Sequence, residues 1–423
     1  MSADSSTLER QLQVYKGLVE VSALINGITD PEELLPEILE VARRVLSVEA
    51  ASLFLVNEFG ELELTAARGG MPQTMPKFVV PRGQGISGWV MENGKPLLVA
   101  DAYADPRFFR GVDAKTGFRT RSVLCVPLSR NGKRIGVLQG INPTGHVSFD
   151  EGDLEAFVAY GNLAATAIDK LRTIEKQRDQ LRMAQEFAFA HEIQTSFLPQ
   201  KLPARDDLTF AATYRPALNV GGDFYDVVQA SPDQYYFVIG DVSGKGMPAA
   251  LLMAQALSSL RLILQGGISP RDAMLHWNSM LIGHTIRGMF ITALLGRITL
   301  PERRLELTNA GHCAPFRSSK GGRSASEIVL EGCPPLGILQ DLAPQSQTLH
   351  FDAHEWLVFF TDGLIESFNA NGDSLDREGV AKILENDFHT AGDVVDSLNT
   401  GEIKHRGDAE PHDDLTVLVF GSR

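Results

Sequence analysis

The sequence is poor in cysteine and in positive charge. Among 423 residues the only cysteines are Cys125, Cys313 and Cys333, which are widely spaced and form no CxxC pair. Such usage excludes a disulfide framework or a thiolate metal site and is typical of a reducing cytosol. Lys and Arg number 39 against 53 Asp and Glu, so the formal net charge is −14. Because no basic cluster offsets this charge, we expect neither a nucleic-acid partner nor an anionic membrane partner.

Targeting features and long apolar runs are also missing. The opening MSADSSTLERQLQ lacks the basic start and the apolar core of a signal peptide, and no uninterrupted apolar run approaches membrane-spanning length. We therefore expect a cytoplasmic protein. With 423 residues, 43% of them hydrophobic, the chain is long enough for two or three domains with full cores.

The first 170 residues read as helices, then strands, then another helix. Residues 8 to about 47 predict two helices separated at Thr29-Asp30-Pro31, where proline suits a first helical turn. Short alternating strand patterns follow, and Asn131-Gly132 predicts a hairpin turn. A helical pattern opens near Asp150 or Asp153, either of which would cap it. This order predicts an α+β domain.

A helical linker is expected from about 163 to 198, where no proline or glycine interrupts the pattern until Leu198-Pro199. Its apolar residues keep heptad-like spacing, first at Leu171, Ile174 and Leu181, and then in a shifted phase at Phe187, Ala190, Ile193 and Phe197. Such a helix is either a rigid spacer or a dimer contact. The pattern favours a parallel homodimer, because the stripe would otherwise be exposed.

Four aspartates mark the ends of strand patterns in the remaining part of the chain. They are Asp223 in GGDFYD, Asp241 in YYFVIGDVSGKG, Asp362 in WLVFFTDGLIE and Asp413 in HDDLTVLVF. One such residue alone is most simply a turn former or a helix cap. Four carboxylates ionised in one pocket would repel one another, and manganese and magnesium prefer carboxylate, carbonyl and water oxygens. The four together therefore predict a divalent metal site.

These motifs resemble the metal-dependent PPM-type protein phosphatases, in their bacterial sporulation stage II E-like branch. The matching strings, in the order of that family, are RPALNVGGDFYDV, IGDVSGKGMPAAL, LTNAGHCAPF, PPLGI, FFTDGLIE and HDDLTVLVF. The resemblance implies an αββα sandwich over residues 199–423 that holds two Mn²⁺ or Mg²⁺ ions and hydrolyses phosphoserine or phosphothreonine.

The resemblance also implies a role for each aspartate. Asp241 would bridge both ions together with the backbone carbonyl of Val242, Asp223 would complete one site, and Asp362 and Asp413 would hold the other. These four aspartates are thus the expected catalytic residues, and with Val242 the expected metal ligands. Two adjacent ions lower the pKa of a bound water and neutralise charge on a phosphoester, which agrees with this role.

Other residues near these motifs leave two interpretations open. His312 in the NAGH turn with Asn309 would either protonate the leaving group or make a structural hydrogen bond. Arg215 would contact the substrate phosphate, as an arginine does in the eukaryotic branch. The turn at 244–246 would either present backbone amides to an anion or pack against the metal loop. Asp226 is either a supporting group or a turn residue, and Asp414 either caps or supports its neighbour.

The motifs are also compatible with two competing functions. GGDFY is similar to the GGDEF signature of diguanylate cyclases, but Phe224 replaces the acidic fourth position, and a cyclase leaves the later strings unexplained. A catalytically silent module that binds a phosphoprotein or a ligand is the alternative from another class. The presence of all four aspartates counts against it.

The N-terminal part, residues 12–170, resembles a GAF sensor domain. The strings that carry the resemblance are GQGISGWVMENGKPLLVADAYADPRF, RSVLCVPLSRNGKRIGVLQGIN and FDEGDLEAFVAYGNLAATAI. GAF domains bind small ligands or none. The cyclic-nucleotide signature has Lys after its Asn, whereas Pro143 follows Asn142 here, which argues against a cyclic nucleotide. Cys125 lies in an apolar strand pattern and is expected in the core.

The whole pattern predicts a sensor-regulated serine/threonine phosphoprotein phosphatase. In the branch that it resembles, regulated members act on a small anti-sigma-factor antagonist. The expected partners are therefore such a phosphoprotein, an unknown small GAF ligand or none, and a second copy of the chain. The linker would carry the signal by rotation or dimerisation, moving the helix near 184–198 against the catalytic sandwich.

Overall fold

The computed structural model describes residues 12, 15–17, 19–24, 27–28, 30–69, 78–145, 147–283, 288–318 and 324–421. The chain divides into two compact units, Met1–Leu181 and Arg182–Arg423. Each unit has its own sheets and its own core.

The N-terminal unit is built on one six-stranded antiparallel sheet with the order β3-β2-β1-β6-β5-β4. The strands are β1 (Val48–Val56), β2 (Leu62–Arg68), β3 (Val79–Val80), β4 (Leu97–Val99), β5 (Val123–Arg130) and β6 (Lys133–Pro143). Asn131 and Gly132 both have positive φ, as a two-residue hairpin turn requires, and Arg130 pairs with Lys133 across it. The predicted hairpin is confirmed.

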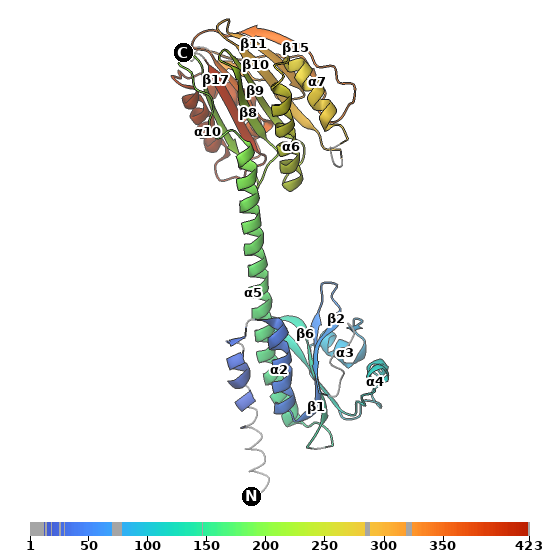
Figure 1. Ribbon diagram of the computed structural model, residues 1–423. Helices are drawn as coiled ribbons and strands as arrows, with labels where there is room; N and C mark the ends of the chain where they lie inside the picture. Colours follow the sequence, from blue (N-terminus) through green and yellow to red (C-terminus); the bar gives the residue numbers. More distant parts are fainter. Residues whose placement is uncertain are drawn as a thin grey trace. The chain divides into compact units, whose positions relative to one another are not determined.

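Helices cover both faces of this sheet (Figure 1). On one face, α2 (Pro31–Val45) and the beginning of α5 (Glu151–Phe197) enclose a core with Leu39, Leu138 and Phe157. On the other face, α3 (Gly85–Asn93) packs on a second cluster, with α4 (Gly111–Thr116) further along the chain. α2 begins at Pro31, as the sequence predicts.

The C-terminal unit contains two sheets. The first has the order β14-β11-β10-β9-β8 with β15 paired to β11, and the second has the order β13-β12-β16-β17-β7. The strands are β7 (Thr209–Arg215), β8 (Phe224–Ser231), β9 (Gln234–Val242), β10 (Ile291–Thr299), β11 (Arg304–Ala310), β12 (Phe316–Ser318), β13 (Ala325–Glu327), β14 (Gly332–Cys333), β15 (Ser346–His350), β16 (Trp356–Phe360) and β17 (Leu415–Gly421).

The two sheets pack face to face between two helical layers (Figure 1). Phe237 of the first sheet meets Phe359 and Phe420 of the second, with ring centroids 4.7 and 5.0 Å apart. α6 (Met247–Leu264) and α7 (Pro270–Leu281) cover the first sheet, and α9 (Asp376–Leu384) and α10 (Ala391–Arg406) cover the second. Because both faces of each sheet are covered, β16 and β17 are buried along their whole length. The predicted αββα sandwich is confirmed.

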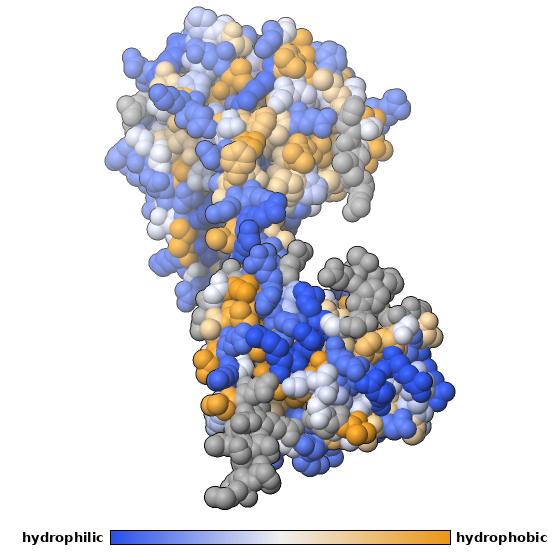
Figure 2. Space-filling model, turned by 60° about the horizontal axis from the view of Figure 1, so that its bottom comes forward, coloured by the Kyte–Doolittle hydropathy of each residue, from blue (hydrophilic) through white to orange (hydrophobic). Residues whose placement is uncertain are grey.

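α5 is one continuous helix of 47 residues that ends two residues before Pro199, as the proline predicts. The predicted apolar stripe of α5, which would contact a second chain, is wrong at one position. Leu171 is only 4% exposed and packs in the core of the N-terminal unit, so it is not available to a second chain. Leu181 and Ile193 are 62% and 48% exposed. On the face drawn in Figure 2, hydrophobic residues form separate patches among hydrophilic ones.

Among the described residues, α6 is the one helix whose length and apolar composition would allow it to cross a membrane. Half of it is buried within the C-terminal unit. Met253, Leu257 and Leu260 lie in the core beneath the first sheet, so packing in the sandwich accounts for its apolar composition.

Candidate functional site

The four aspartates lie at strand ends of both sheets. Asp223 directly precedes β8, and Asp241 is the penultimate residue of β9, so both belong to the first sheet. Asp362 follows β16 and begins the short helix α8 (Asp362–Ile365), and Asp413 lies two residues before β17, so both belong to the second sheet. The sandwich therefore brings these segments, which are far apart in sequence, to one edge.

The carboxylates lie close enough together that the pKa values of Asp223, Asp241 and Asp362 are all raised. Burial, followed by the charges of Asp362 and Asp413, raises the pKa of Asp241 to about 7. Burial and the charge of Asp241 raise the pKa of Asp223 well above its ordinary value. The pKa of Asp362 is raised by burial, by Glu366 and by Asp413. Without a cation, the cluster thus opposes its own ionisation.

Asp223 is the most firmly held member of the cluster. It is 1% exposed, and its Oδ2 accepts hydrogen bonds from the hydroxyl groups of Thr361 at 2.6 Å and Thr416 at 2.8 Å. Both threonines belong to the second sheet or its edge, whereas Asp223 belongs to the first. The two hydroxyl groups therefore fix the Asp223 carboxylate across the gap between the sheets.

The loop before Asp223 is fastened by Asp414. This buried carboxylate accepts hydrogen bonds from the backbone N–H groups of Ala217 at 2.8 Å and Gly222 at 2.6 Å. Gly221 lies so close that an added Cβ would be 2.1 Å from Asp414 Oδ2, which explains the glycine. Asp414 therefore stabilises the loop that leads to Asp223, in addition to any support that it gives to its neighbour Asp413.

A lysine already neutralises part of the cluster. The Lys245 ammonium lies 3.1 Å from Asp413 Oδ2 and donates a hydrogen bond of 2.6 Å to the carbonyl of His412. Lys245 belongs to the turn that opens α6, where Gly244 and Gly246 have positive φ. The turn at 244–246 therefore places a lysine side chain at the acidic edge. This contact differs from both roles predicted for the turn, which were binding an anion and packing against the metal loop.

The donor set fits a hard divalent cation. In the described part of the chain, no three His, Cys, Asp or Glu side chains are already grouped as a ready-made metal site. A Cβ on Gly222 would, however, lie 2.6 Å from the carbonyl oxygen of Val242 and 3.3 Å from Asp241 Oδ1, so only glycine leaves both oxygens open. Oxygen donors of this kind suit manganese or magnesium. The roles of Asp223, Asp241, Val242, Asp362 and Asp413 as ligands stay predictions.

Two charged residues singled out in the sequence are engaged in ion pairs. Arg215, expected to contact the substrate phosphate, donates to Glu402, a residue of α10 that is buried and also bonded by Ser367. Asp226 is buried on β8 and pairs with Arg261 of α6 at 2.6 Å. Asp226 thus joins helix to sheet, which favours a supporting role over a turn residue.

The contacts of His312 favour a structural hydrogen bond over protonation of the leaving group. Its Nδ1 lies 2.9 Å from the Thr292 hydroxyl, and its main chain is bonded on both sides by the Asn309 side chain. Its Nε2 is buried beside the main chain of Phe360 without a well-formed hydrogen bond. Burial lowers its pKa to about 4, so the imidazole is neutral at pH 7 and is not the imidazolium that a general acid would need.

Three residues that support the site, Thr361, Thr416 and Gln194, were not among those predicted from the sequence. The two threonines adjoin recognised motifs, TDG and DDLT, so their hydroxyl groups were a signal that could have been used. Gln194 carried no local signal. It lies on α5, and its side chain pairs with the backbone of Gly221, which comes 27 residues later in the chain. Gly221 belongs to the GGDFYD motif, but the helical pattern around Gln194 does not indicate this contact.

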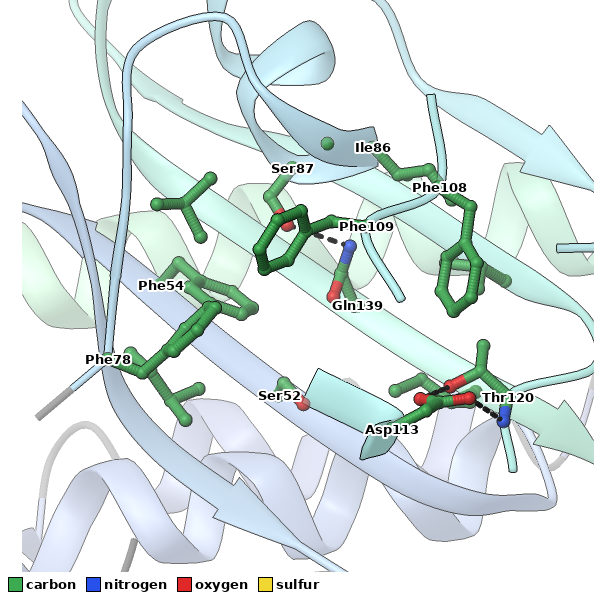
Figure 3. Close-up of a pocket in the computed structure, with 15 residues that line it drawn as sticks. Ser52, Phe54, Phe78, Ile86, Ser87, Phe108, Phe109, Asp113, Thr120 and Gln139 are labelled. Atoms are coloured by element: carbon green, nitrogen blue, oxygen red, sulfur yellow. Dashed lines mark hydrogen bonds between the residues drawn. The ribbon is translucent and has the colours of Figure 1, made fainter. Parts of the chain in front are cut away.

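The N-terminal unit contains a pocket with a volume of about 70 Å³ (Figure 3). Four aromatic rings line it, those of Phe54, Phe78, Phe108 and Phe109. Gln139 donates to Ser87 at 3.0 Å, and Asp113 accepts from the Thr120 hydroxyl at 2.8 Å. The buried Ser52 hydroxyl has no hydrogen-bond partner among the residues that the structure describes. No Lys or Arg is among the described residues that line the pocket.

Asn142, the residue compared with the cyclic-nucleotide signature, is a structural residue. It is fully buried, accepts from the backbone N–H groups of Arg121 and Ser122, and donates to Glu49 at 2.8 Å. Cys125 is also fully buried, and burial raises the pKa of its thiol to about 12. Its expected place in the core is confirmed.

Comparisons with known proteins agree with this division. Residues 231–423 match the family model described as Stage II sporulation protein E (SpoIIE), and residues 30–168 match the GAF domain model. The first match contains Asp241, Asp362 and Asp413 and begins after Asp223. The proposed boundaries of 12–170, 163–198 and 199–423 stay predictions.

Individual proteins that are similar to this chain include phosphatases. The chain is 27% identical over 268 residues to the phosphoserine phosphatase RsbU of Bacillus subtilis, covering 63% of this chain and 77% of that protein. It is 25% identical to the protein IcfG of Synechocystis over 54% of this chain but only 40% of that protein. The solved SiaA-PP2C domain of Pseudomonas aeruginosa has the same fold, with a TM-score of 0.51 and 18% identity over 58% of this chain and 98% of that domain.

Two family models and one relative thus cover both units. The chain carries a GAF domain and a SpoIIE-type PP2C phosphatase domain, and it is homologous to the phosphoserine phosphatase RsbU.

Proposed function

We propose that this protein is a metal-dependent serine/threonine phosphoprotein phosphatase that works with two Mn²⁺ or Mg²⁺ ions. The observation that supports this most is the carboxylate cluster at the edge of the sandwich, in which burial and mutual repulsion raise the pKa of Asp241 to about 7. A cluster that opposes its own ionisation is suited to divalent cations.

The proposed ligands are Asp223, Asp241, Asp362 and Asp413, with the carbonyl of Val242. Bound ions would supply a water of lowered pKa and neutralise charge on the phosphoryl group. The chain's own part is to hold the oxygens in place. Thr361 and Thr416 orient the Asp223 carboxylate. His312 is neutral and bonded to Thr292, so it stabilises the turn rather than moving a proton.

The proposed substrate is phosphoserine or phosphothreonine on a small protein of the anti-sigma-factor-antagonist class. The family resemblance implies this class, and the phosphoserine phosphatase RsbU is a relative. We place the enzyme in the cytoplasm, in agreement with its acidic charge and its three free cysteines.

The enzymatic proposal is tested by hydrolysis of an aryl phosphate and of phosphoserine proteins encoded near the gene, with Mn²⁺ or with a chelator. The full chain should hydrolyse the phosphoester only with metal, and Asp241→Asn should remove this activity. Exposed Asp408→Asn is the matched control and should leave turnover unchanged. If the wild type bound phosphoprotein without hydrolysing it under any metal condition, the silent binding module would be the better description.

We further propose that the pocket of the GAF domain is the sensor. Its aromatic lining and the unpartnered Ser52 hydroxyl suit a small uncharged ligand with a ring and one hydrogen-bonding edge. The anionic phosphate of a cyclic nucleotide would meet the Asp113 carboxylate and no cationic side chain among the described lining residues. Calorimetry with cyclic GMP and cyclic AMP tests this, and binding in the micromolar range would contradict it.

We also propose that the protein is a homodimer through the exposed stripe of α5. Leu181 and Ile193 are large apolar residues on the solvent side of that helix. Replacing both with Asp should yield a monomer in analytical ultracentrifugation and change turnover, whereas Gln180→Asp, a polar position on the same helix, should do neither. An unchanged sedimentation coefficient together with unchanged turnover would exclude this role of the linker.

A further inference from the structure

Gln194, on the last part of α5, makes contacts that its place in a linker helix does not explain. The side chain is only 4% exposed, although most residues on that stretch of the helix are exposed. It reaches away from its own helix and contacts the loop that leads to Asp223.

The contact is a two-sided pairing between the side-chain amide of Gln194 and the backbone N–H and C=O of a single residue, Gly221. Gln194 Nε2 donates to the carbonyl of Gly221, and Gln194 Oε1 accepts from the N–H of Gly221 at 3.2 Å. The Tyr214 hydroxyl also donates to Oε1, at 3.3 Å. A side-chain amide carries a donor and an acceptor in one plane, which this pairing requires. A buried hydrogen bond of this kind is costly to leave unmade.

The loop held in this way has little freedom of its own. From one side Asp414 accepts the N–H groups of Ala217 and Gly222, and from the other Gln194 holds Gly221. The glycines at 221 and 222 permit this close packing, because a Cβ on either would overlap a neighbouring oxygen. Asp223 follows immediately, so the path of this loop decides where its carboxylate points.

Gln194 itself is anchored. Arg261 of α6 donates to the carbonyl of Phe197 at 2.7 Å, and its guanidinium also pairs with the buried Asp226 of β8 at 2.6 Å. The end of α5 is therefore fastened to the sandwich one turn after Gln194. The distance between the helix and the loop is thus set at two points, by Arg261 and by Gln194.

We propose that Gln194 is a positioning residue that holds the loop at 221–223 in the conformation in which Asp223 serves the metal centre. This inference rests on the proposed function. It names a residue that touches neither the metal nor the substrate, but that decides the geometry of one ligand. Residues with such a supporting role typically change metal affinity by about 10- to 100-fold when they are replaced.

The test compares three variants of the full-length protein. Gln194→Leu removes both halves of the pairing with little change in volume. Gln194→Glu keeps an acceptor for the Gly221 N–H but places a carboxylate against the Gly221 carbonyl. Gln180→Leu, at an exposed position of the same helix, is the control. Mn²⁺ affinity is measured by calorimetry, hydrogen exchange is followed in residues 217–224, and folding is checked by thermal unfolding in chelator.

We expect Gln194→Leu to bind Mn²⁺ about 10- to 100-fold more weakly and to lose exchange protection at Gly221. Gln194→Glu should weaken Mn²⁺ binding but retain protection at that amide, and Gln180→Leu should match the wild type. If the Leu variant fails to fold, the Glu variant carries the test. Unchanged Mn²⁺ affinity in a folded variant that has lost the Gly221 protection would overturn the inference alone. A wild type that binds no Mn²⁺ would overturn the proposed function as well.

Discussion

Replacing Asp241 with Asn should stabilise the metal-free protein at alkaline pH, although it removes the proposed central ligand. In the fold, burial and the neighbouring carboxylates raise the pKa of Asp241 from its ordinary 3.8 to about 7. Above that pH the ionised carboxylate is held among other negative charges. Asn resembles the protonated acid in shape and carries no charge, so it removes this repulsion.

The sign and the size of the change in the free energy of unfolding follow from the linkage between proton binding and folding. Because the folded-state pKa is raised, the stability that the protonated group contributes is fully present below about pH 4 and is lost as the pH rises through about 7. With those two pKa values, the advantage of Asn over Asp is about 4 kcal/mol at pH 8 and about 2 kcal/mol at pH 5. Both figures are upper bounds, since the fold relaxes around an ionised group.

The assay is urea unfolding in chelator, followed by tryptophan fluorescence. Trp277 and Trp356 are buried in the C-terminal unit, and Trp89→Phe removes the only tryptophan of the other unit, so the signal reports the phosphatase domain alone. Asp408→Asn, at an exposed position, is the control and should show no such gain. An Asp241→Asn protein that is equally stable or less stable than the wild type at pH 8 would refute the electrostatic reasoning.

Three further changes probe other parts of the domain. Lys245→Gln removes the ammonium that pairs with Asp413, so the carboxylate no longer has a competing cation. The variant should bind Mn²⁺ up to about fivefold more tightly in calorimetry, whereas weaker binding would favour a role of Lys245 in holding the loop. Glu402→Ala leaves Arg215 without its buried partner and should lower the free energy of unfolding by about 3 kcal/mol. A loss below about 0.5 kcal/mol, which is typical of a surface substitution, would show that the ion pair is not needed for stability. Phe420→Ala opens a cavity between the sheets and should cost about 3 to 5 kcal/mol in the same assay, while a cost near that of an exposed position would contradict the packing.

Local patterns in the sequence were sufficient for much of the fold. The Asn131-Gly132 turn predicts a hairpin because few other pairs accept positive φ at both positions, and the structure contains it. Pro199 ends α5 as expected, because proline cannot continue a helix. The apolar runs before Asp241 and Asp362 are strands buried on both faces, which is why they lack alternation.

Other features depended on contacts between distant residues. Leu171 kept a heptad position, but it is buried in the core of its own unit, since periodicity does not say which surface covers a stripe. Arg215 was expected at the phosphate, yet Glu402, 187 residues away in the sequence, takes its guanidinium. The side chain of Gln194 is placed by Gly221, which no helical pattern can indicate.

The sequence by itself determined the kinds of groups present. It supplied four aspartates at strand ends, glycines where the backbone must pass closely, and two regions that match different families. Only the tertiary structure decided how these groups meet: that both sheets bring their carboxylates to one edge, that Thr361 and Thr416 orient Asp223, and that α5 reaches its loop through Gln194. The reason is physical. Local patterns record the conformation of a segment. The pKa of Asp241 and the direction of each side chain arise instead from packing between separate segments, which lie 27 residues apart for Gln194 and Gly221 and 138 residues apart for Asp223 and Thr361.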